Sequence, residues 1–189
     1  MKIILGSGSK WRAQELKKAG IDFTVMSPDI DEKAIRDTDP EKLTLTLARA
    51  KAKAILGTIH EPALVITADQ VVIFEGAIRE KPENKEEAVE FVSSYGDHPA
   101  EVVNGIVVTN TETGKTIEAI DRSTVFYKPS LKDVALEVVE NSYAMTCAGA
   151  LVTENPLMLA HEKERSGGDD SFNGMPIALV QKMLKEAAG

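Results

Sequence analysis

Residues 64–74 of this chain read LVITADQVVIF. This is a run of branched apolar residues interrupted only at 67–70, and its length and composition predict a buried central strand. A carboxylate inside such a run is costly to bury unless it is paired or used. In a regular strand, Asp69 projects to one face of the sheet and Gln70 to the other. Asp69 is therefore the strongest candidate for a functional residue.

The sequence on either side of this strand alternates predicted strands and helices. A helix beginning at Pro40 is well signalled, because Asp39 can cap it and Gly57 lies just beyond its end. Further helices are expected over 11–19, 84–95, 130–139 and 175–187. Strands are expected over 2–5, 23–27 and 148–153, with a long hairpin over 102–109 and 116–127. This order predicts an α/β fold with a mixed sheet flanked by helices.

Length and composition exclude several classes of protein. The 189 residues suit a single domain over 1–189, and 22 basic against 30 acidic residues give a net charge of −8. Such an acidic chain is a poor non-specific binder of nucleic acid. No apolar run is long enough for a signal peptide or a bilayer span, so we expect a soluble, cytoplasmic protein. The lone Cys147 excludes an intrachain disulfide and a cysteine-based zinc site.

The loop after the first strand is a candidate phosphate-binding segment. Residues 6–12 read GSGSKWR, so small residues precede a helix whose free N–H groups can approach an oxyanion. Ser7 can donate a hydroxyl, and Arg12 can clamp phosphate with its planar guanidinium. The other interpretation is an ordinary turn between a strand and a helix. The segment lacks the Gly-Lys-Ser/Thr ending of a Walker loop.

Carboxylates and lysines elsewhere complete a candidate site. Glu32 lies in an acidic loop that could hold Mg²⁺ through oxygen ligands, although a solvated loop is the commoner case. One lysine of the helix over 40–54, Lys51 or Lys53, is expected to point inward. Lys81 follows a predicted turn and could reach over a site, or lie on a surface loop. Together these groups suit chemistry on a nucleoside triphosphate and its Mg²⁺.

In the order of its short motifs, the chain resembles the Maf family of nucleoside triphosphate pyrophosphatases over nearly its whole length. The matching segments are LGSGSKWR at 5–12, DE at 31–32, LARAKA at 47–52, ADQVV at 68–72, EKP at 80–82, CAGA at 147–150 and GMP at 174–176. The resemblance implies the Maf/inosine-triphosphatase fold, with two lobes around a central cleft, and a homodimer. It also implies metal-dependent hydrolysis of a nucleoside triphosphate to the monophosphate and pyrophosphate.

By the same resemblance, Asp69 accepts the proton of the attacking water and helps Glu32 to hold a divalent metal, Mg²⁺ or else Mn²⁺ or Co²⁺. The phosphate-binding residues implied are Ser7, Arg12, Lys51 and Lys81. A carboxylate base needs reach to a water beside the α-phosphate. Cationic side chains stabilise charge on the leaving pyrophosphate. These roles agree with the chemistry that the residue types allow.

Three positions bear on the choice of base. They are Trp11, Gln70 and Glu154. The family branch that prefers dTTP and UTP carries Arg, Thr and Gln at these positions. At all three, this chain resembles the branch that accepts 7-methyl-GTP, with UTP or CTP as further substrates. N7-methylguanine is a cation, so stacking on Trp11 would gain roughly 0.5–2 kcal/mol. Glu154 could accept protons from the N1 and N2 edge of guanine. Packing of Trp11 at a helix start and exposure of Glu154 are the alternatives.

Three other functions stay open at this point. The first is a dTTP/UTP pyrophosphatase of the same family. The second is a nucleotide-binding regulator of cell division that does not turn nucleotide over, against which the set of Asp69, Lys51, Lys81 and Glu32 argues. The third is an inosine/xanthosine triphosphatase, which shares the architecture but would not need Trp11 and Glu154.

Overall fold

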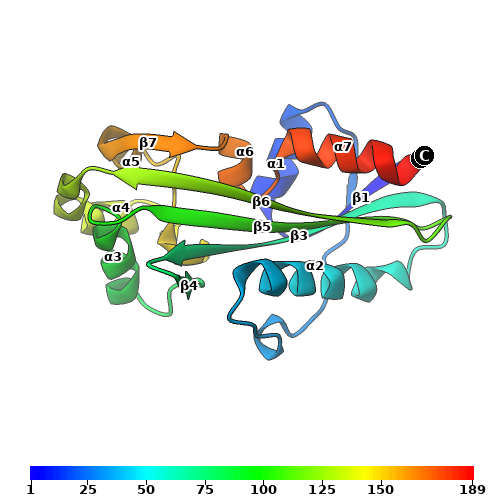
Figure 1. The fold of residues 1–189 in the computed structure, drawn as a ribbon, viewed down its shortest axis with the longest axis horizontal. Coiled ribbons are helices and arrows are strands. Elements are labelled where there is room, and N and C mark those ends of the chain that lie inside the picture. The colour runs from blue at the N-terminus through cyan, green and yellow to red at the C-terminus, as the bar shows by residue number, and fades with distance from the viewer. The chain divides into compact units, whose positions relative to one another are not determined.

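A mixed sheet of seven strands organises the chain. The computed structural model describes residues 1–189, and its strands follow the order β2-β1-β3-β5-β6-β7, with β4 paired to β3 (Figure 1). Pairing is parallel between β1 and both β2 and β3, and antiparallel in the β3–β4 and β6–β7 pairs. The strands are β1 (Lys2–Gly6), β2 (Thr24–Val25), β3 (Ala63–Phe74), β4 (Ala77–Arg79), β5 (Ala100–Asn110), β6 (Thr116–Tyr127) and β7 (Glu162–Ser166). The predicted mixed sheet is confirmed.

Helices connect most of these strands, as predicted. They are α1 (Lys10–Lys18), α2 (Pro40–Leu56), α3 (Lys85–Ser94), α4 (Ala135–Glu140), α5 (Pro156–His161), α6 (Asp169–Phe172) and α7 (Ile177–Ala188). Asp39 caps α2 by accepting from the backbone N–H groups of Glu41 and Lys42, with Pro40 at the first helical turn. Asn84 caps α3 by accepting from the N–H of Glu87. The helix start predicted at Pro40 and the helix expected over 84–95 are thus confirmed.

The chain folds as two compact units. The first unit comprises residues 1–70, 104–121 and 173–189, and the second comprises 71–103 and 122–172. Strands β3, β5 and β6 each contribute residues to both units. The prediction of one domain over 1–189 and that of a cleft between two lobes both stay predictions.

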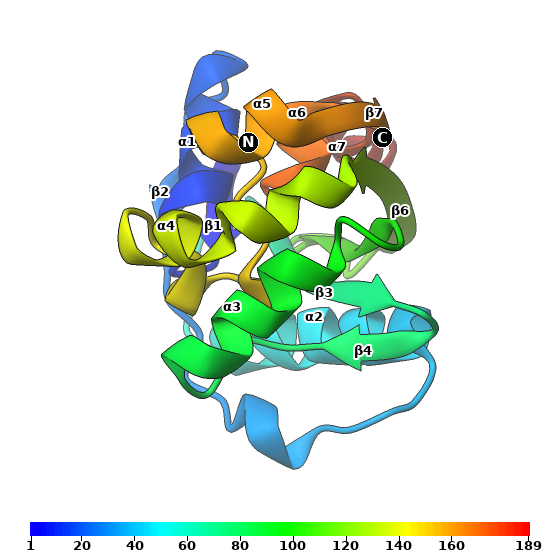
Figure 2. The same ribbon diagram turned by 90° about the vertical axis from the view of Figure 1, so that its left-hand side faces the viewer.

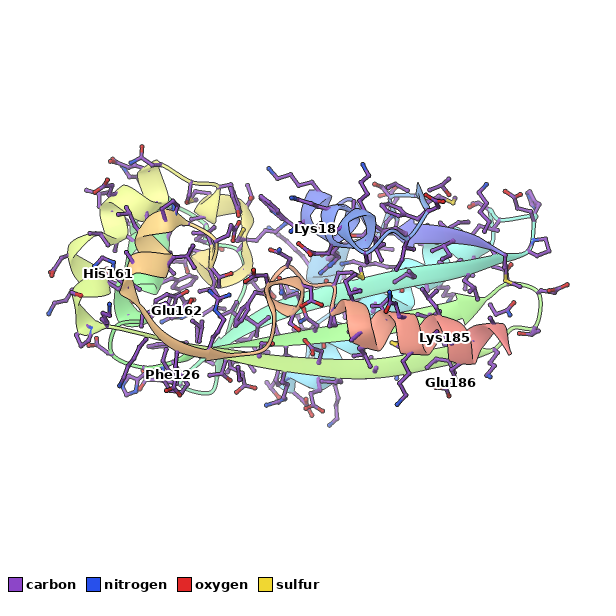
Figure 3. The ribbon with its side chains drawn as sticks, turned by 90° about the horizontal axis from the view of Figure 1, so that it is seen from above. Lys18, Phe126, His161, Glu162, Lys185 and Glu186 are labelled. Carbon is purple, nitrogen blue, oxygen red and sulfur yellow. The ribbon has the colours of Figure 1, made fainter.

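In the first unit, helices cover both faces of the sheet (Figure 1). Leu64 and Ile66 of β3 share a core with α1 and α7, whereas Val65 packs in a separate cluster with Ile55 of α2. The outward side of α7 is polar, and Figure 3 marks Lys185 and Glu186 on it. Because side chains alternate along a strand, Thr67 and Asp69 fall on the α2 side. Consistent with this, Thr67 Oγ1 donates to the Ala48 carbonyl of α2 at 2.8 Å.

The second unit has its own apolar core, on which α3 and α4 pack side by side (Figure 2). The guanidinium of Arg79 lies over three rings of this unit, 3.8 Å from the centroid of Phe74, 4.5 Å from that of Phe91 and 5.2 Å from that of Tyr95. Arg79 Nη1 also donates to Ser94 Oγ at 2.7 Å. Arg79 therefore joins the end of β4 to α3.

The predicted strand over 148–153 is wrong. A short 3₁₀ turn covers Ala148–Ala150 instead, with non-helical backbone at Gly149. Gly149 and Ala150 both have positive φ, at 59° and 51°, which a β-strand does not accommodate. The Tyr95 hydroxyl donates to the Gly149 carbonyl at 2.6 Å, and a Cβ at position 149 would lie 2.5 Å from that hydroxyl. The close approach of Tyr95 and the left-handed backbone explain why a glycine stands here and why the segment does not extend.

Other boundaries also differ from the predictions. The strand predicted over 23–27 shortens to Thr24–Val25, because its partner β1 ends at Gly6. The helix predicted over 130–139 divides into a 3₁₀ helix over Pro129–Asp133 and α4, and neither start has a side-chain cap bond. The sequence reading missed β4, α5, α6 and β7. Asn155, which accepts from the N–H groups of Leu157 and Met158 ahead of Pro156, was the usable signal for α5.

Candidate active site

A buried lysine and two carboxylates form the centre of the site in the first unit. Lys51 Nζ donates to Asp69 Oδ1 at 2.6 Å and lies 3.2 Å from Glu32 Oε1. Lys51 and Asp69 are 6% and 7% exposed, whereas the side chain of Glu32 is 55% exposed. Between Lys51 and Lys53, which the sequence left open, Lys51 is the one on the buried face of α2.

Regular secondary structure explains this meeting. Leu47, Ala48, Lys51 and Ile55 recur at helical spacing and form the buried face of α2. Strand alternation directs Asp69 toward the same helix. Glu32 begins a short 3₁₀ helix over Glu32–Ala34, which Asp31 caps by accepting from the backbone N–H of Lys33. The acidic loop predicted from the sequence thus contributes Glu32 to the site.

Burial and neighbouring charges act against each other on the ionisation of Asp69. Burial raises the pKa of Asp69, while the nearby cations Lys51 and Arg12 oppose the rise and Glu32 adds to it. The net direction is upward. Burial also lowers the pKa of Arg12, against the attraction of Asp69 and Glu32. A raised pKa makes a carboxylate a stronger base once it is ionised, which suits a group that accepts a proton from water.

Arg12 is buried and its donors are directed into the first unit. Nη1 donates to Ser7 Oγ at 3.2 Å and to the Ala68 carbonyl at 2.9 Å, while Nε donates to the Gly174 carbonyl at 3.1 Å. Ser7 Oγ also accepts from the backbone N–H of Ser9 at 3.2 Å. The Gly/Ser loop and the start of α1 are therefore ordered by bonds within the chain, next to the residue that precedes Asp69.

Of the base-recognition residues, Trp11 and Gln70 belong to the first unit. Trp11 is half-buried on α1 beside Arg12, and the Lys10 ammonium lies 4.7 Å from the centroid of its ring. Gln70 is half-buried at the residue after Asp69, where strand alternation gives it the opposite face. One face of the Trp11 ring thus has a cation near it in this structure.

Lys81 and Glu154 belong to the second unit. Lys81 is exposed between Glu80, whose carbonyl accepts from the Gly149 N–H at 2.8 Å, and the buried Pro82. Glu154 is exposed, one residue before the cap of α5. The anchored backbone around Lys81 suits a lysine that must present its ammonium in one direction. The substrate-binding roles of Lys81 and Glu154 stay predictions.

Two features of the site were not found from the sequence. Gly174 supplies a carbonyl to Arg12, and the buried Glu15 accepts from Asn173 Nδ2 at 2.8 Å and pairs with Lys18 at 2.7 Å. Both contacts join α1 to the segment ahead of α7, which is far away in the sequence. The glycine two residues ahead of Pro176 was the available signal for the first, and nothing in the local pattern indicated the second.

Glu32 and Asp69 are the carboxylates of this site that could hold a divalent cation. Both approach the single ammonium of Lys51, and no group of three or more His, Cys, Asp or Glu side chains forms a ready set of metal ligands. Mg²⁺ commonly uses one or two carboxylates together with water and substrate phosphates. The two carboxylates therefore fit such an ion, with phosphate oxygens supplying the remaining ligands.

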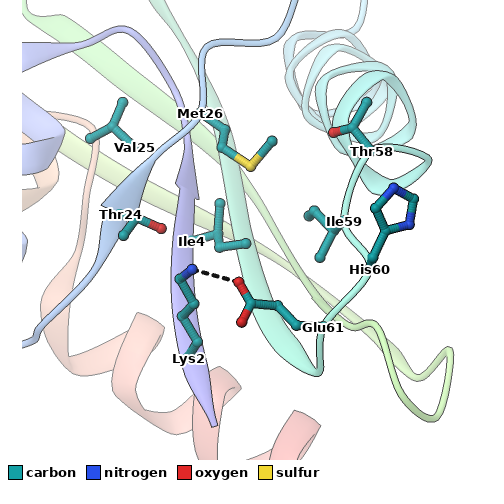
Figure 4. A pocket seen from close by; sticks show the side chains of 9 residues that line it. All are labelled: Lys2, Ile4, Thr24, Val25, Met26, Thr58, Ile59, His60 and Glu61. Atoms are coloured by element: carbon teal, nitrogen blue, oxygen red, sulfur yellow. Dashed lines mark hydrogen bonds and ion pairs between the residues drawn. The ribbon is translucent and has the colours of Figure 1, made fainter.

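A separate surface hollow of about 450 Å³ lies elsewhere on the first unit. It is lined by residues of β1, β2 and the segment over 58–61, and the ion pair of Lys2 with Glu61 lies along it at 2.6 Å (Figure 4). None of the predicted site residues lines this hollow. This hollow is therefore separate from the candidate active site.

Comparison with known proteins decides the family. A family model described as Maf-like protein matches residues 2–187. This chain belongs to the Maf family. It is 39% identical to a 7-methyl-GTP pyrophosphatase of Dictyostelium discoideum, covering 98% of this chain and 97% of that protein.

Two bacterial Maf relatives extend the comparison. A 7-methyl-GTP pyrophosphatase of Vibrio vulnificus strain CMCP6 is 31% identical, covering 98% of this chain and 94% of that protein. A nucleoside triphosphate pyrophosphatase of Synechococcus sp. strain JA-2-3B'a(2-13) is also 31% identical, covering 97% and 93%. None of the helices of this Maf chain combines the length and the hydropathy needed to cross a membrane.

Proposed function

We propose that this Maf-family chain hydrolyses a nucleoside triphosphate to the monophosphate and pyrophosphate, with 7-methyl-GTP as the preferred substrate. The observation that carries the proposal is the buried Asp69 carboxylate, held 2.6 Å from the Lys51 ammonium, with Arg12 of α1 bonded to the adjacent Ala68 carbonyl and to Ser7. The names of its relatives support the same reaction.

Asp69 acts as the general base in this proposal. Its carboxylate accepts a proton from the water that attacks the α-phosphate, which requires Asp69 to be ionised. Lys51 compensates the buried charge, so the carboxylate persists although burial raises its pKa. As the proton reaches Asp69, the ammonium of Lys51 is freed to interact with a phosphate oxygen. One lysine thus serves the base first and the developing phosphate charge afterwards.

The triphosphate is bound by cationic and hydroxyl groups. Ser7, Arg12 and Lys51 supply them from the first unit, and Lys81 adds an ammonium from the second. Glu32 and Asp69 would hold a divalent cation, most simply Mg²⁺ and otherwise Mn²⁺ or Co²⁺. Such an ion neutralises phosphate charge and lowers the pKa of a bound water.

The preference for 7-methyl-GTP follows from Trp11, Gln70 and Glu154. The Trp11 ring has a cation 4.7 Å from its centroid in this structure, which supports an affinity of this face for positive charge. N7-methylguanine carries such a charge and a flat ring. Glu154 would accept from the guanine N1 and N2 edge, and Gln70 would add an amide to base recognition. UTP and CTP would be secondary substrates.

A cytoplasmic location and a homodimer are further parts of the proposal. The homodimer comes from the family resemblance and the cytoplasmic location from the apolar patterning of the sequence, and both suit an enzyme that clears modified nucleotides from the free pool. Sedimentation of the purified chain tests the dimer directly.

A nucleotide panel tests the proposed reaction. The chain would be incubated with Mg²⁺ and 7-methyl-GTP, GTP, UTP, CTP, dTTP or ITP, and pyrophosphate and orthophosphate would be measured separately. We expect pyrophosphate release, greatest with 7-methyl-GTP, and loss of about 10²- to 10⁴-fold in kcat for Asp69→Asn. Faster pyrophosphate release from dTTP or ITP than from 7-methyl-GTP would overturn the base preference but not the reaction. Binding without turnover would favour a nucleotide-binding regulator instead.

A further inference from the structure

Gly174 meets the buried Arg12 from a distant part of the chain. It precedes α7 and has a φ of 77°, and its carbonyl accepts from Arg12 Nε at 3.1 Å. A Cβ added at this position would lie 3.0 Å from Arg12 Nε and 3.3 Å from Nη2. Both the left-handed backbone and the face presented to the guanidinium therefore demand a residue without a side chain.

The opposite end of the guanidinium contacts two elements of the candidate site. Nη1 donates to Ser7 Oγ at 3.2 Å and to the Ala68 carbonyl at 2.9 Å. The guanidinium is planar and rigid, so a displacement at Nε is transmitted to Nη1. Three of its five N–H groups serve acceptors within the first unit, which leaves the two of Nη2 for a phosphate.

The Ala68 carbonyl connects Gly174, through Arg12, to the proposed base Asp69. This carbonyl belongs to the peptide group that leads into Asp69, so the bond from Arg12 fixes the backbone from which the proposed base projects. Ser7 is held by the same nitrogen and also accepts from the N–H of Ser9. Arg12 thus sets the base and the Gly/Ser loop relative to each other.

We propose that Gly174 is a positioning residue for hydrolysis, which seats Arg12 so that Arg12 fixes Asp69 and Ser7. The inference rests on the proposed function, because it assumes that Asp69 is the base. It differs from a simple phosphate-clamp role for Arg12, since a clamp would be felt mainly in substrate binding. A misplaced base would be felt in the chemical step, where errors near 1 Å can cost about 10²-fold.

The first test compares two glycine variants that share the same backbone cost. Gly20 also has a positive φ, of 69°, but a Cβ there would meet nothing within 4 Å. Gly174→Ala is expected to lower kcat about 10- to 100-fold, with a smaller rise in KM because Nη2 of Arg12 also moves, while Gly20→Ala leaves both within about twofold. Equal kinetics for the two variants, or a rise in KM alone for Gly174→Ala, would overturn the inference.

A double-mutant cycle tests whether Gly174 acts through Arg12. If it does, adding Gly174→Ala to Arg12→Lys lowers kcat little further than Arg12→Lys alone, because the guanidinium that Gly174 positions is already gone. Losses that multiply would show that Gly174 acts by another route. If Gly174→Ala does not fold, Gly174→Asn tolerates a positive φ yet keeps the Cβ against Arg12, and the same kinetic result is expected.

A third readout separates this inference from the proposed reaction. Backbone hydrogen exchange over residues 66–70 is expected to speed up in Gly174→Ala and to stay unchanged in Gly20→Ala. If the wild-type chain hydrolyses no nucleotide, the proposed function fails, and this exchange alone decides whether Gly174 orders the backbone beside Asp69. If hydrolysis occurs and exchange does not differ, the positioning inference fails while the reaction stands.

Discussion

The ammonium of Lys51 lies 2.6 Å from the carboxylate of Asp69, and both residues are buried. Such a pair has a large desolvation cost, which the mutual attraction offsets only while both partners are present. The exposed Glu32 carboxylate, 3.2 Å from the same ammonium, adds a second partner. The arrangement keeps a charged group in an apolar strand, at the position that the sequence analysis had singled out as the strongest candidate for a functional residue.

Removal of Lys51 is the first prediction. Lys51→Met leaves Asp69 buried without its nearest cation, and breaking such a pair costs about 3–5 kcal/mol of unfolding free energy. We also expect kcat to fall about 10²- to 10³-fold, because a phosphate contact is lost with the charge. Chemical denaturation and steady-state kinetics measure the two effects.

Lys53→Met is the matched control for this variant. Lys53 is on the same helix but exposed, so its replacement should change the unfolding free energy by no more than about 0.5 kcal/mol. Should Lys53→Met be the more damaging change, the assignment of Lys51 to the site would be wrong.

The dependence of activity on pH is the second prediction. Burial raises the pKa of Asp69 above its ordinary value, and only the ionised carboxylate can accept a proton. Activity is therefore lost as the pH falls through this raised pKa, so the acid limb of kcat/KM lies above the usual titration range of an aspartate. Lys51 opposes the rise, so Lys51→Met should move the acid limb further upward. An acid limb at or below the ordinary aspartate range would contradict the role of Asp69.

Local patterns predicted much of the fold because they report local physics. The apolar run over 64–74, the cap at Asp39 and the glycine beyond α2 each reflect contacts made within a few residues. The same holds for Asp69, whose charge conflicts with its apolar neighbours. The segment over 148–153 escaped because its conformation depends on the Tyr95 hydroxyl, which is 54 residues away from Gly149.

The residues of the candidate site could be proposed from the sequence where residue type and local sequence context were enough to indicate a chemical role. Ser7, Arg12, Lys51 and Glu32 were all named from the sequence. In the structure Lys51 contacts both Asp69 and Glu32, while Arg12 contacts Ser7 and the Ala68 carbonyl beside Asp69. The choice between Lys51 and Lys53 could be made only from the packing of α2 against the sheet. The use of Arg12 donors on Gly174 and Ala68 could not be predicted, because it depends on how distant segments meet.

Stability of the second unit gives the third prediction. Arg79 lies over three aromatic rings and donates to Ser94 Oγ and to the Phe91 carbonyl. Arg79→Met retains apolar contact but loses the charge on the rings and both hydrogen bonds, which should cost about 2–3 kcal/mol of unfolding free energy. Arg79→Lys should be intermediate, because lysine cannot stack as a plane.

Lys85→Met serves as the comparison for Arg79. Its ion pair with Glu140 is half-exposed in the same unit, and exposed pairs contribute about 0–1 kcal/mol. If thermal denaturation placed Lys85→Met at or below Arg79→Met, the aromatic contacts of Arg79 would not be stabilising the unit.

Discrimination between a cationic and a neutral base gives the last prediction. The Lys10 ammonium lies 4.7 Å from the centroid of the Trp11 ring. It is positively charged, as N7-methylguanine is, and therefore competes with the base for the cation–π interaction with this ring. Trp11→Leu should lower the ratio of kcat/KM for 7-methyl-GTP over GTP by about 2- to 30-fold, which corresponds to a cation–π gain of 0.5–2 kcal/mol. Lys10→Ala should raise the same ratio, because one like charge leaves the ring. The two variants act in opposite directions only if the base stacks on Trp11, and a shared direction would place the base elsewhere.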